Sequence, residues 1–169
     1  SLEQLIISIS AIAVGVIAVF YAKLFSFCEE YFFEMFDKSP VIVCALIPVI
    51  FIMATALVKF IAPEAEASGI PAVLEAVHHI EHTAEHKIKN ENLVSLKTAA
   101  LKIFASCIGV LGGMSLGMEG PMVQVASSIY SFTSLRVKKI LPHINRRVYL
   151  IAGGAAGIAA AFNTPIGGV

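Results

Sequence analysis

The sequence predicts an all-α integral membrane protein with several spans, some of them built from broken or re-entrant helices. The first observation is composition: 57% of the 169 residues are hydrophobic and 14% are charged, whereas about a quarter of a soluble domain is charged. The second is a set of apolar runs long enough to cross a bilayer. The third is a set of shorter apolar segments that open with glycine and proline. Together these observations exclude an ordinary soluble domain.

Three apolar runs are long enough to cross a hydrocarbon core about 30 Å thick, namely 5–27, 41–62 and 93–113. The second run follows Pro40, a suitable first residue for a helix, and contains Pro48, which we expect to kink it. The third run carries Lys102 far from its ends. We therefore expect Lys102 to face protein or water and not lipid.

Three further apolar segments are too short, or too rich in glycine and alanine, to make comfortable lipid-facing spans: 67–77, 121–135 and 148–162. Short segments that open with glycine or proline are typical of broken or re-entrant helices. Such backbone is tolerated at membrane depth only where protein or an aqueous cavity surrounds it. These segments are therefore the ones expected to line a polar site.

The charged connections predict an orientation. The connection 28–39 carries four acidic residues and one lysine, whereas the connection 136–147 carries five lysines and arginines. By the positive-inside rule the basic connection is cytoplasmic and the acidic one lies outside. Counting crossings then places the N-terminus in the cytoplasm, and we expect a multi-pass protein of the cell (plasma or inner) membrane.

Several function classes find no support in the sequence. Zero net charge argues against a nucleic-acid binder. The cysteines Cys28, Cys44 and Cys107 show neither a CxxC spacing nor a disulfide framework. No nucleophile, base and orienting group recur at usable spacing, so we expect neither an enzyme nor a resident cofactor or metal.

Two short motifs carry the chemistry: Ser68-Gly69-Ile70-Pro71 and Gly117-Met118-Glu119-Gly120-Pro121. Each places glycine and proline at the start of a helix. The first amides of a helix lack intrahelical acceptors, and the helix dipole adds about half a positive charge there. Two such helix starts converging inside a membrane would bind an anion without a lysine or arginine, weakly enough for the ion to leave again.

Glu119 is the single residue that points most specifically to a function. A carboxylate at membrane depth is costly, and this one lies where helix amides attract negative charge. It can compete with an anion for one site, blocking that site when bound and opening it when protonated or displaced. The alternative is that Glu119 only caps the helix that begins near Pro121, and Ser68 has the same alternative as an N-cap.

The motifs resemble those of the CLC family of chloride channels and chloride/proton exchangers. Three segments match elements of that family, in the order in which the family has them. They are 67–71, then 117–121 followed by Val123 and Gln124, and then 153–168. The resemblance covers about the last hundred residues. It departs at Met118, where the family usually has arginine, and at Ala67, where the family has glycine.

The resemblance implies a role for each motif residue. Ser68 would coordinate a central chloride with its hydroxyl, beside Gly69 and Ile70 of the same element. Glu119 would be the gating glutamate and, in exchangers, the carrier of the proton. The backbone at Met118, Glu119 and Gly120 would line the outer anion site. Loss of arginine at 118 removes a positive charge, so conductance, gating or anion preference is expected to differ from that of typical members.

The resemblance also implies an architecture and a function. CLC membrane domains consist of two inverted halves, and residues 1–169 would form most of the first half as a single partial domain, with the second half absent. The parent protein would be a homodimer in a lipid bilayer. It would transport chloride under voltage or pH gating, as a channel or as a Cl⁻/H⁺ antiporter.

Two alternatives from other function classes remain open in the sequence. His78, His82 and His86 recur every four residues, so one helix face could bind zinc and the protein could transport a divalent metal. A non-catalytic membrane scaffold is the other alternative. Glycines at a spacing of four suit close helix packing, and they are Gly109, Gly113 and Gly117, together with Gly153 and Gly157.

Overall fold

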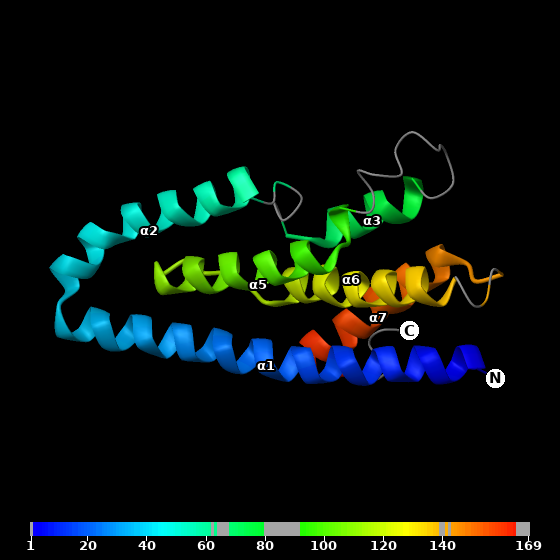
Figure 1. Ribbon diagram of the computed structural model, residues 1–169. Helices are drawn as coiled ribbons and strands as arrows, with labels where there is room; N and C mark the ends of the chain where they lie inside the picture. Colours follow the sequence, from blue (N-terminus) through cyan, green and yellow to red (C-terminus); the bar gives the residue numbers. More distant parts are fainter. Residues whose placement is uncertain are drawn as a thin grey trace.

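The computed structural model describes residues 2–61, 63, 68–79, 92–138, 141 and 143–164. These residues are helical apart from short turns and connections, as Figure 1 shows, which confirms the all-α prediction. The helices are α1 (Leu2–Lys38), α2 (Pro40–Ile61), α3 (Ile70–His79), α5 (Leu96–Leu111), α6 (Glu119–Val137) and α7 (Arg146–Ala161).

The first helix is longer than the sequence analysis predicted. The segment 28–39 was expected to be an acidic connection, but α1 continues to Lys38 and only Ser39 separates it from α2. The segment contains neither glycine nor proline before Pro40, so nothing interrupts the helix. An ion pair of 2.6 Å between Lys38 Nζ and Glu34 Oε1, four residues apart, supports its last turn.

The second helix agrees with its prediction. Pro40 is its first residue, where the missing amide would have had no partner in any case. The helix passes through Pro48 and ends at Ile61, and the kink expected at Pro48 stays a prediction. Most of α2 is exposed, with Val41 and Phe60 each 81% accessible. Such an apolar exposed surface suits lipid.

The third predicted span is shorter in the structure than in the sequence analysis. The hydroxyl of Ser95 accepts a hydrogen bond of 3.1 Å from the Thr98 amide and begins α5 one residue later. The helix ends before Gly112 and Gly113, and Gly113 has a φ of +76° where a side chain would collide with the Phe32 ring. Sixteen residues rise about 24 Å, which is less than the thickness of a bilayer core.

The helix α6 is the centre of the molecule. It packs against α7, α5, α1 and α3, and Figure 1 shows it alongside α1 and α5. The most extensive contact is with α7, and it is close, because a Cβ atom on Gly153 or Gly157 would lie 2.8 Å from a backbone Cα of α6. These two glycines therefore pack as the sequence predicted.

The buried serines of α6 make hydrogen bonds with their hydroxyls. Ser128 donates a hydrogen bond of 2.7 Å to the Gln124 carbonyl, and Ser134 donates one of 2.7 Å to the Ser131 carbonyl. Ser127 donates across the helix contact to the Leu150 carbonyl of α7 at 3.4 Å. Small polar residues that bond to backbone in this way allow close packing of helices in a membrane.

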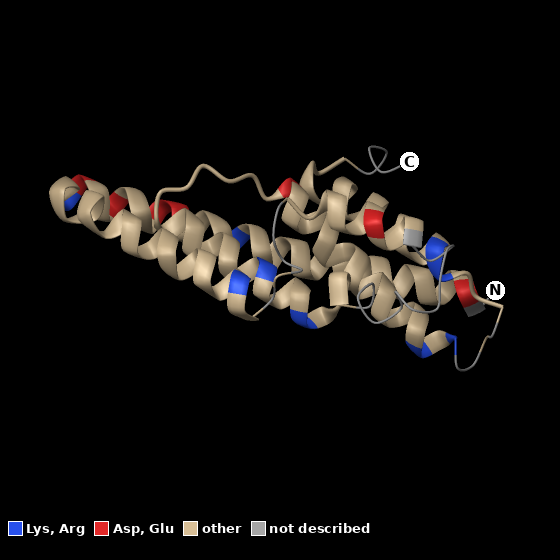
Figure 2. Cartoon of the chain, turned by 90° about the horizontal axis from the view of Figure 1, so that it is seen from above, with Lys and Arg blue, Asp and Glu red and all other residues tan. Residues whose placement is uncertain are grey.

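Within the described residues, two helices are both long enough and apolar enough to cross a bilayer: α1 over 3–38, and α2. Exposed apolar side chains cover both, including Ile12 at 67% and Ile52 at 69%. Acidic residues in the last three turns of α1 colour one end of the molecule red in Figure 2. The apolar surface between the charged ends agrees with a membrane protein.

Candidate anion site

The two motifs singled out in the sequence meet in space. Gly69 precedes α3, Gly120 is the second residue of α6, and their backbones are in contact. A Cβ atom on Gly69 would lie 2.8 Å from the Gly120 carbonyl oxygen, and one on Gly120 would collide with the Ser68 carbonyl oxygen. Gly69 also has a φ of +98°, which side-chain-bearing residues rarely adopt. Glycine at both positions therefore allows the two helix starts to touch.

A cleft of about 910 Å³ opens at this contact. Ser68, Gly117, Glu119 and Gly120 line it, and α2 and α5 supply further wall residues. Glu119 and Gly120, the first two residues of α6, line the cleft, so α6 begins there with amides that lack an intrahelical acceptor. An anion in the cleft would therefore meet the positive end of the α6 dipole.

Glu119 is the first residue of α6 and is half-buried on the wall of the cleft. Its carboxylate lies over the backbone of Gly117, where any Cβ atom would collide with the Oε2 atom. The residue at the N-cap position is Met118, and no side chain there caps the helix by a hydrogen bond. No side chain at the N-cap position therefore closes the helix start, and the Glu119 carboxylate lies beside it.

Two residues of the motifs, Ile70 and Met118, are not among those that line the cleft. The Ile70 side chain is 43% exposed at the first position of α3. The Met118 side chain is half-buried and packs against the main hydrophobic core, away from the residues that line the cleft. The structure thus brings Ser68, Glu119 and Gly120 together on one surface, with Gly69 directly behind them.

Gln124 anchors this arrangement from one turn further along α6. Its side chain is fully buried, and Nε2 donates a hydrogen bond of 2.9 Å to the Leu93 carbonyl oxygen. A Cβ atom on Gly69 would lie 2.9 Å from the Cβ of Gln124. Gln124 therefore holds the segment before α5 and the start of α3 against α6. The sequence analysis used this residue only as part of a motif and gave it no role.

The helix α5 adds polar residues that the sequence analysis did not place in the site. Lys102 and Ser106 both line the cleft, at 5% and 6% exposure. The Ser106 hydroxyl donates to the Ile103 carbonyl at 2.8 Å and lies 2.8 Å from the Tyr21 hydroxyl of α1. The expectation that Lys102 avoids lipid is confirmed, because its side chain is buried against the cleft.

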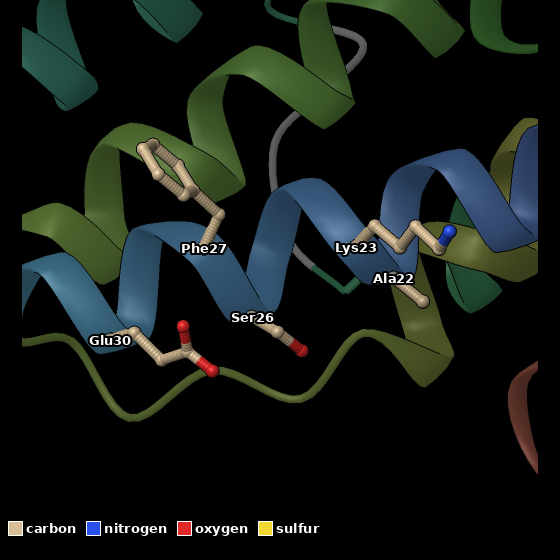
Figure 3. A pocket seen from close by; sticks show the side chains of 5 residues that line it. All are labelled: Ala22, Lys23, Ser26, Phe27 and Glu30. Carbon is tan, nitrogen blue, oxygen red and sulfur yellow. The ribbon is translucent and has the colours of Figure 1, made fainter.

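A second, smaller pocket of about 290 Å³ lies on α1. Figure 3 shows Ser26 and Glu30 pointing to one side of the helix and Phe27 pointing away from them. Ala22 and Lys23 complete the lining, and none of these residues belongs to the two motifs. This pocket is therefore separate from the anion cleft.

The metal-ion alternative gains nothing from the structure. His78 lies near the end of α3, but His82 and His86 fall outside the described residues. Within the part of the chain that is described, no three metal-ligating side chains gather. The segment 153–168 that resembled the family is described only as far as Thr164.

Comparison with known proteins decides the family. The model of the voltage-gated chloride channel family matches residues 50–169, which is more than two thirds of the chain. This protein belongs to the voltage-gated chloride channel family. The match includes both motifs of the cleft, so the resemblance to CLC proteins is confirmed.

Curated members of the family are similar over most of this chain. An uncharacterized chloride channel protein of Schizosaccharomyces pombe is 34% identical over 84% of the chain and 20% of its own length. An anion/proton exchange transporter of Saccharomyces cerevisiae is 34% identical over 78% of the chain and 16% of its own length.

The human H⁺/Cl⁻ exchange transporter 7 is 33% identical over 70% of the chain and 15% of its own length. The chain thus spans a fifth or less of the length of these relatives. No solved structure matches it.

Proposed function

We propose that the protein transports chloride across a membrane through the cleft that α2, α5, the start of α6 and Ser68 line. The observation that carries this proposal is the direct contact of two helix starts, at Gly69 and Gly120, on the wall of a cleft that also holds Glu119. Helix starts are anion sites by their amides and dipoles, and a cleft inside a membrane protein is a route for an ion. Relatives named as chloride channels and H⁺/Cl⁻ exchange transporters agree with chloride as the anion.

In this mechanism chloride binds to backbone amides at the starts of α3 and α6, with the Ser68 hydroxyl as a further donor. Gly69, Ile70, Met118 and Gly120 contribute backbone and close approach, as the family pattern implies. These donors are neutral and distributed, so the ion is held without being trapped. The site requires no resident cofactor, and chloride is its cargo.

Glu119 serves as the gate. Its carboxylate carries the same charge as chloride and lies at the same helix start, so the two compete for the amides. Protonation removes that competition and releases the side chain toward the open volume of the cleft. A glutamate that takes up a proton each time chloride replaces it couples the two ions. We therefore place the protein among chloride/proton exchangers. In support, the human relative is named an H⁺/Cl⁻ exchange transporter and the Saccharomyces cerevisiae relative an anion/proton exchange transporter.

The remaining parts of the proposal follow the family pattern. The gate responds to voltage or pH because a charged, protonatable side chain moves within the membrane field. The working protein is a homodimer of the cell membrane, with the N-terminus of this chain in the cytoplasm.

The experiment is a comparison of chloride and proton fluxes in liposomes that contain the full-length protein. Glu119→Gln keeps the size of the side chain and cannot release a proton. We expect it to lower proton flux at least about tenfold while chloride flux persists, because the neutral amide no longer competes as an anion. Glu29→Gln on the exposed end of α1 is the matched control, with both fluxes unchanged.

If Glu119→Gln keeps both full chloride flux and coupled proton flux, Glu119 is not the gate. A wild-type protein that moves chloride but no protons would make the protein a channel and leave chloride transport intact.

A further inference from the structure

The wall that α5 gives to the cleft carries a hydroxyl whose hydrogen bonds have defined directions. Ser106 is 6% exposed and lines the cleft together with Glu119. Its single proton is donated to the Ile103 carbonyl oxygen at 2.8 Å. The Tyr21 hydroxyl of α1 lies 2.8 Å from the Ser106 Oγ atom, and Tyr21 is the donor of that bond because the Ser106 proton is already used. Ser106 therefore has no proton left to give to an ion in the cleft.

The Ser106 oxygen can accept one more hydrogen bond. A hydroxyl oxygen carries two lone pairs, and the bond from Tyr21 uses one of them. The Cys107 thiol also lies beside Ser106, but a thiol is only a weak donor. The remaining lone pair therefore suits an O–H group in the cleft and not an anion. This is the opposite of the role proposed for Ser68, whose hydroxyl donates to chloride.

The segment that leads to the gate packs against the same face of α5. Gly109, one turn after Ser106, also lines the cleft, and an ideal Cβ atom on it would lie 3.0 Å from the Leu116 side chain. Glu119 follows three residues after Leu116 and begins α6. The Tyr21 hydroxyl behind Ser106 lies within electrostatic reach of the Glu119 carboxylate. A change of side-chain rotamer therefore suffices to turn this carboxyl group toward Ser106 across the cleft.

We propose that the Ser106 oxygen accepts a hydrogen bond from the protonated Glu119 side chain when the gate opens. The proposal rests on the proposed chloride transport and adds the place to which the gate moves. A protonated carboxyl group is an O–H donor, so it can bond to the free lone pair of Ser106. The ionised carboxylate only accepts hydrogen bonds and cannot make this contact. Ser106 therefore stabilises the protonated, open gate and leaves the amides at the start of α6 to chloride.

The test is the dependence of chloride flux on pH in liposomes that contain the full-length protein. Ser106→Ala removes the acceptor, so opening should need more acid, and we expect the pH of half-maximal flux to fall by about half to one unit. Tyr21→Phe is the matched control, because it breaks the same bond between α1 and α5 but leaves the acceptor in place. It should shift the half-maximal pH by no more than about 0.2 units. Ser106→Thr keeps a hydroxyl and should retain the wild-type profile.

A second comparison separates the gate from the other charged groups of the cleft. Among the described residues that line it, these are Lys59 of α2 and Lys102 of α5. Glu119→Gln removes the titration of the gate, because glutamine does not titrate. In that background, adding Ser106→Ala should leave the pH profile of chloride flux unchanged. A shift there would mean that Ser106 acts on another group, and the proposal would be wrong.

An unshifted profile in Ser106→Ala also overturns the proposal. So does an equal shift in Ser106→Ala and Tyr21→Phe, because the loss that these variants share is the bond between α1 and α5, which is a structural role. If wild-type protein moves no chloride at any pH, the proposed function fails and this proposal fails with it. Chloride transport by wild type together with an unshifted profile in Ser106→Ala rejects the role of Ser106 alone.

Discussion

At the scale of single residues, the site depends on the absence of side chains as much as on their presence. Ser68 and Gly120 approach so closely that the Gly120 Cα leaves no room for a methyl group. The obstacle is the Ser68 backbone, which cannot move aside as the end of a flexible side chain can. Gly15 on α1 offers a contrast, since nothing lies within 4 Å of a Cβ atom there. The same substitution at these two glycines therefore has opposite expected effects.

We expect Gly120→Ala to separate the starts of α3 and α6 and to lower chloride flux at least about tenfold. The overpacked backbone contact should also cost about 1–3 kcal/mol of stability. Gly15→Ala should leave flux unchanged and stabilise its helix by up to about 1 kcal/mol, because alanine is the better helix former. Flux in liposomes and thermal unfolding in detergent measure both effects. If the two variants show the same chloride flux and the same stability, the close contact at Gly120 is not needed for transport.

The sequence was informative about residues whose role is local. Ser68, Gly69 and Glu119 follow from motif chemistry, because glycine, proline and a carboxylate at a helix start are readable within five residues. Lys102 and Gln124 are different, since the surroundings of each side chain depend on which helix lies beside it. The Gln124 amide donates to a carbonyl 31 positions earlier in the chain. No local sequence pattern predicts such a partner.

At the scale of helices, the pairing of α6 and α7 is the most extensive contact between helices among the described residues. Gly157 faces the Val123 Cα at 2.8 Å from its ideal Cβ position, and Gly153 faces the Ser127 Cα at the same distance. Their neighbour Gly154 has the nearest atom, the Ser127 hydroxyl oxygen, at 3.7 Å, which is ordinary van der Waals contact. Three glycines on one helix thus differ in how much space surrounds them.

This difference gives a second prediction with an internal control. Gly157→Ala should push α7 away from α6 and destabilise the protein by about 1–3 kcal/mol, because the obstacle is backbone. Gly154→Ala should be neutral or slightly stabilising, within about 1 kcal/mol. Thermal unfolding of the two variants in the same detergent, with wild type alongside, measures the difference. Comparable losses in both would mean that helix propensity and not close packing governs α7.

Element boundaries were predictable where a cap or breaker marks them. Pro40 starts α2 as predicted, and Gly112 and Gly113 follow the end of α5 where the predicted run ends. The start of α5 after its N-cap Ser95 was predicted three residues too early. The boundary of α1 was missed because charge was taken as a sign of a connection. Glutamate and lysine are good helix formers, so an acidic stretch without glycine or proline continues a helix into water. The 37 residues of α1 rise about 55 Å, well beyond a bilayer core.

At the scale of the whole molecule, charge is distributed along the long axis. The acidic end of α1 projects beyond the apolar stretch, and Figure 2 shows it at one end of the molecule. The last turn of α6 carries Arg136, and Lys138 follows it. The broken, short helices α3 and α6 begin at the cleft between these regions. The all-α membrane fold class was predictable because hydropathy indicates which segments face lipid and which face water. The packing of α6 against its neighbours was not, because it depends on contacts between residues distant in sequence.

The orientation in the membrane is the prediction that belongs to this scale. Asp37 and Lys138 are both exposed, and the positive-inside rule places them on opposite sides, with Asp37 outside and Lys138 in the cytoplasm. Single cysteines introduced at each position report the side by reaction with a membrane-impermeant maleimide on intact cells. The background variant is Cys44→Ser, because Cys44 is exposed whereas Cys28 and Cys107 are buried.

We expect Asp37→Cys to label on intact cells and Lys138→Cys to label only after permeabilisation, with the background variant unlabelled in both conditions. The physical reason is that lysine and arginine near a helix end resist translocation, whereas acidic residues affect it little. If Lys138→Cys labels from outside and Asp37→Cys is protected, the protein has the opposite orientation in the membrane and the prediction is wrong. Because Asp37 lies in the last turn of α1 and Lys138 caps the end of α6, the same measurement fixes the direction in which both helices run through the membrane.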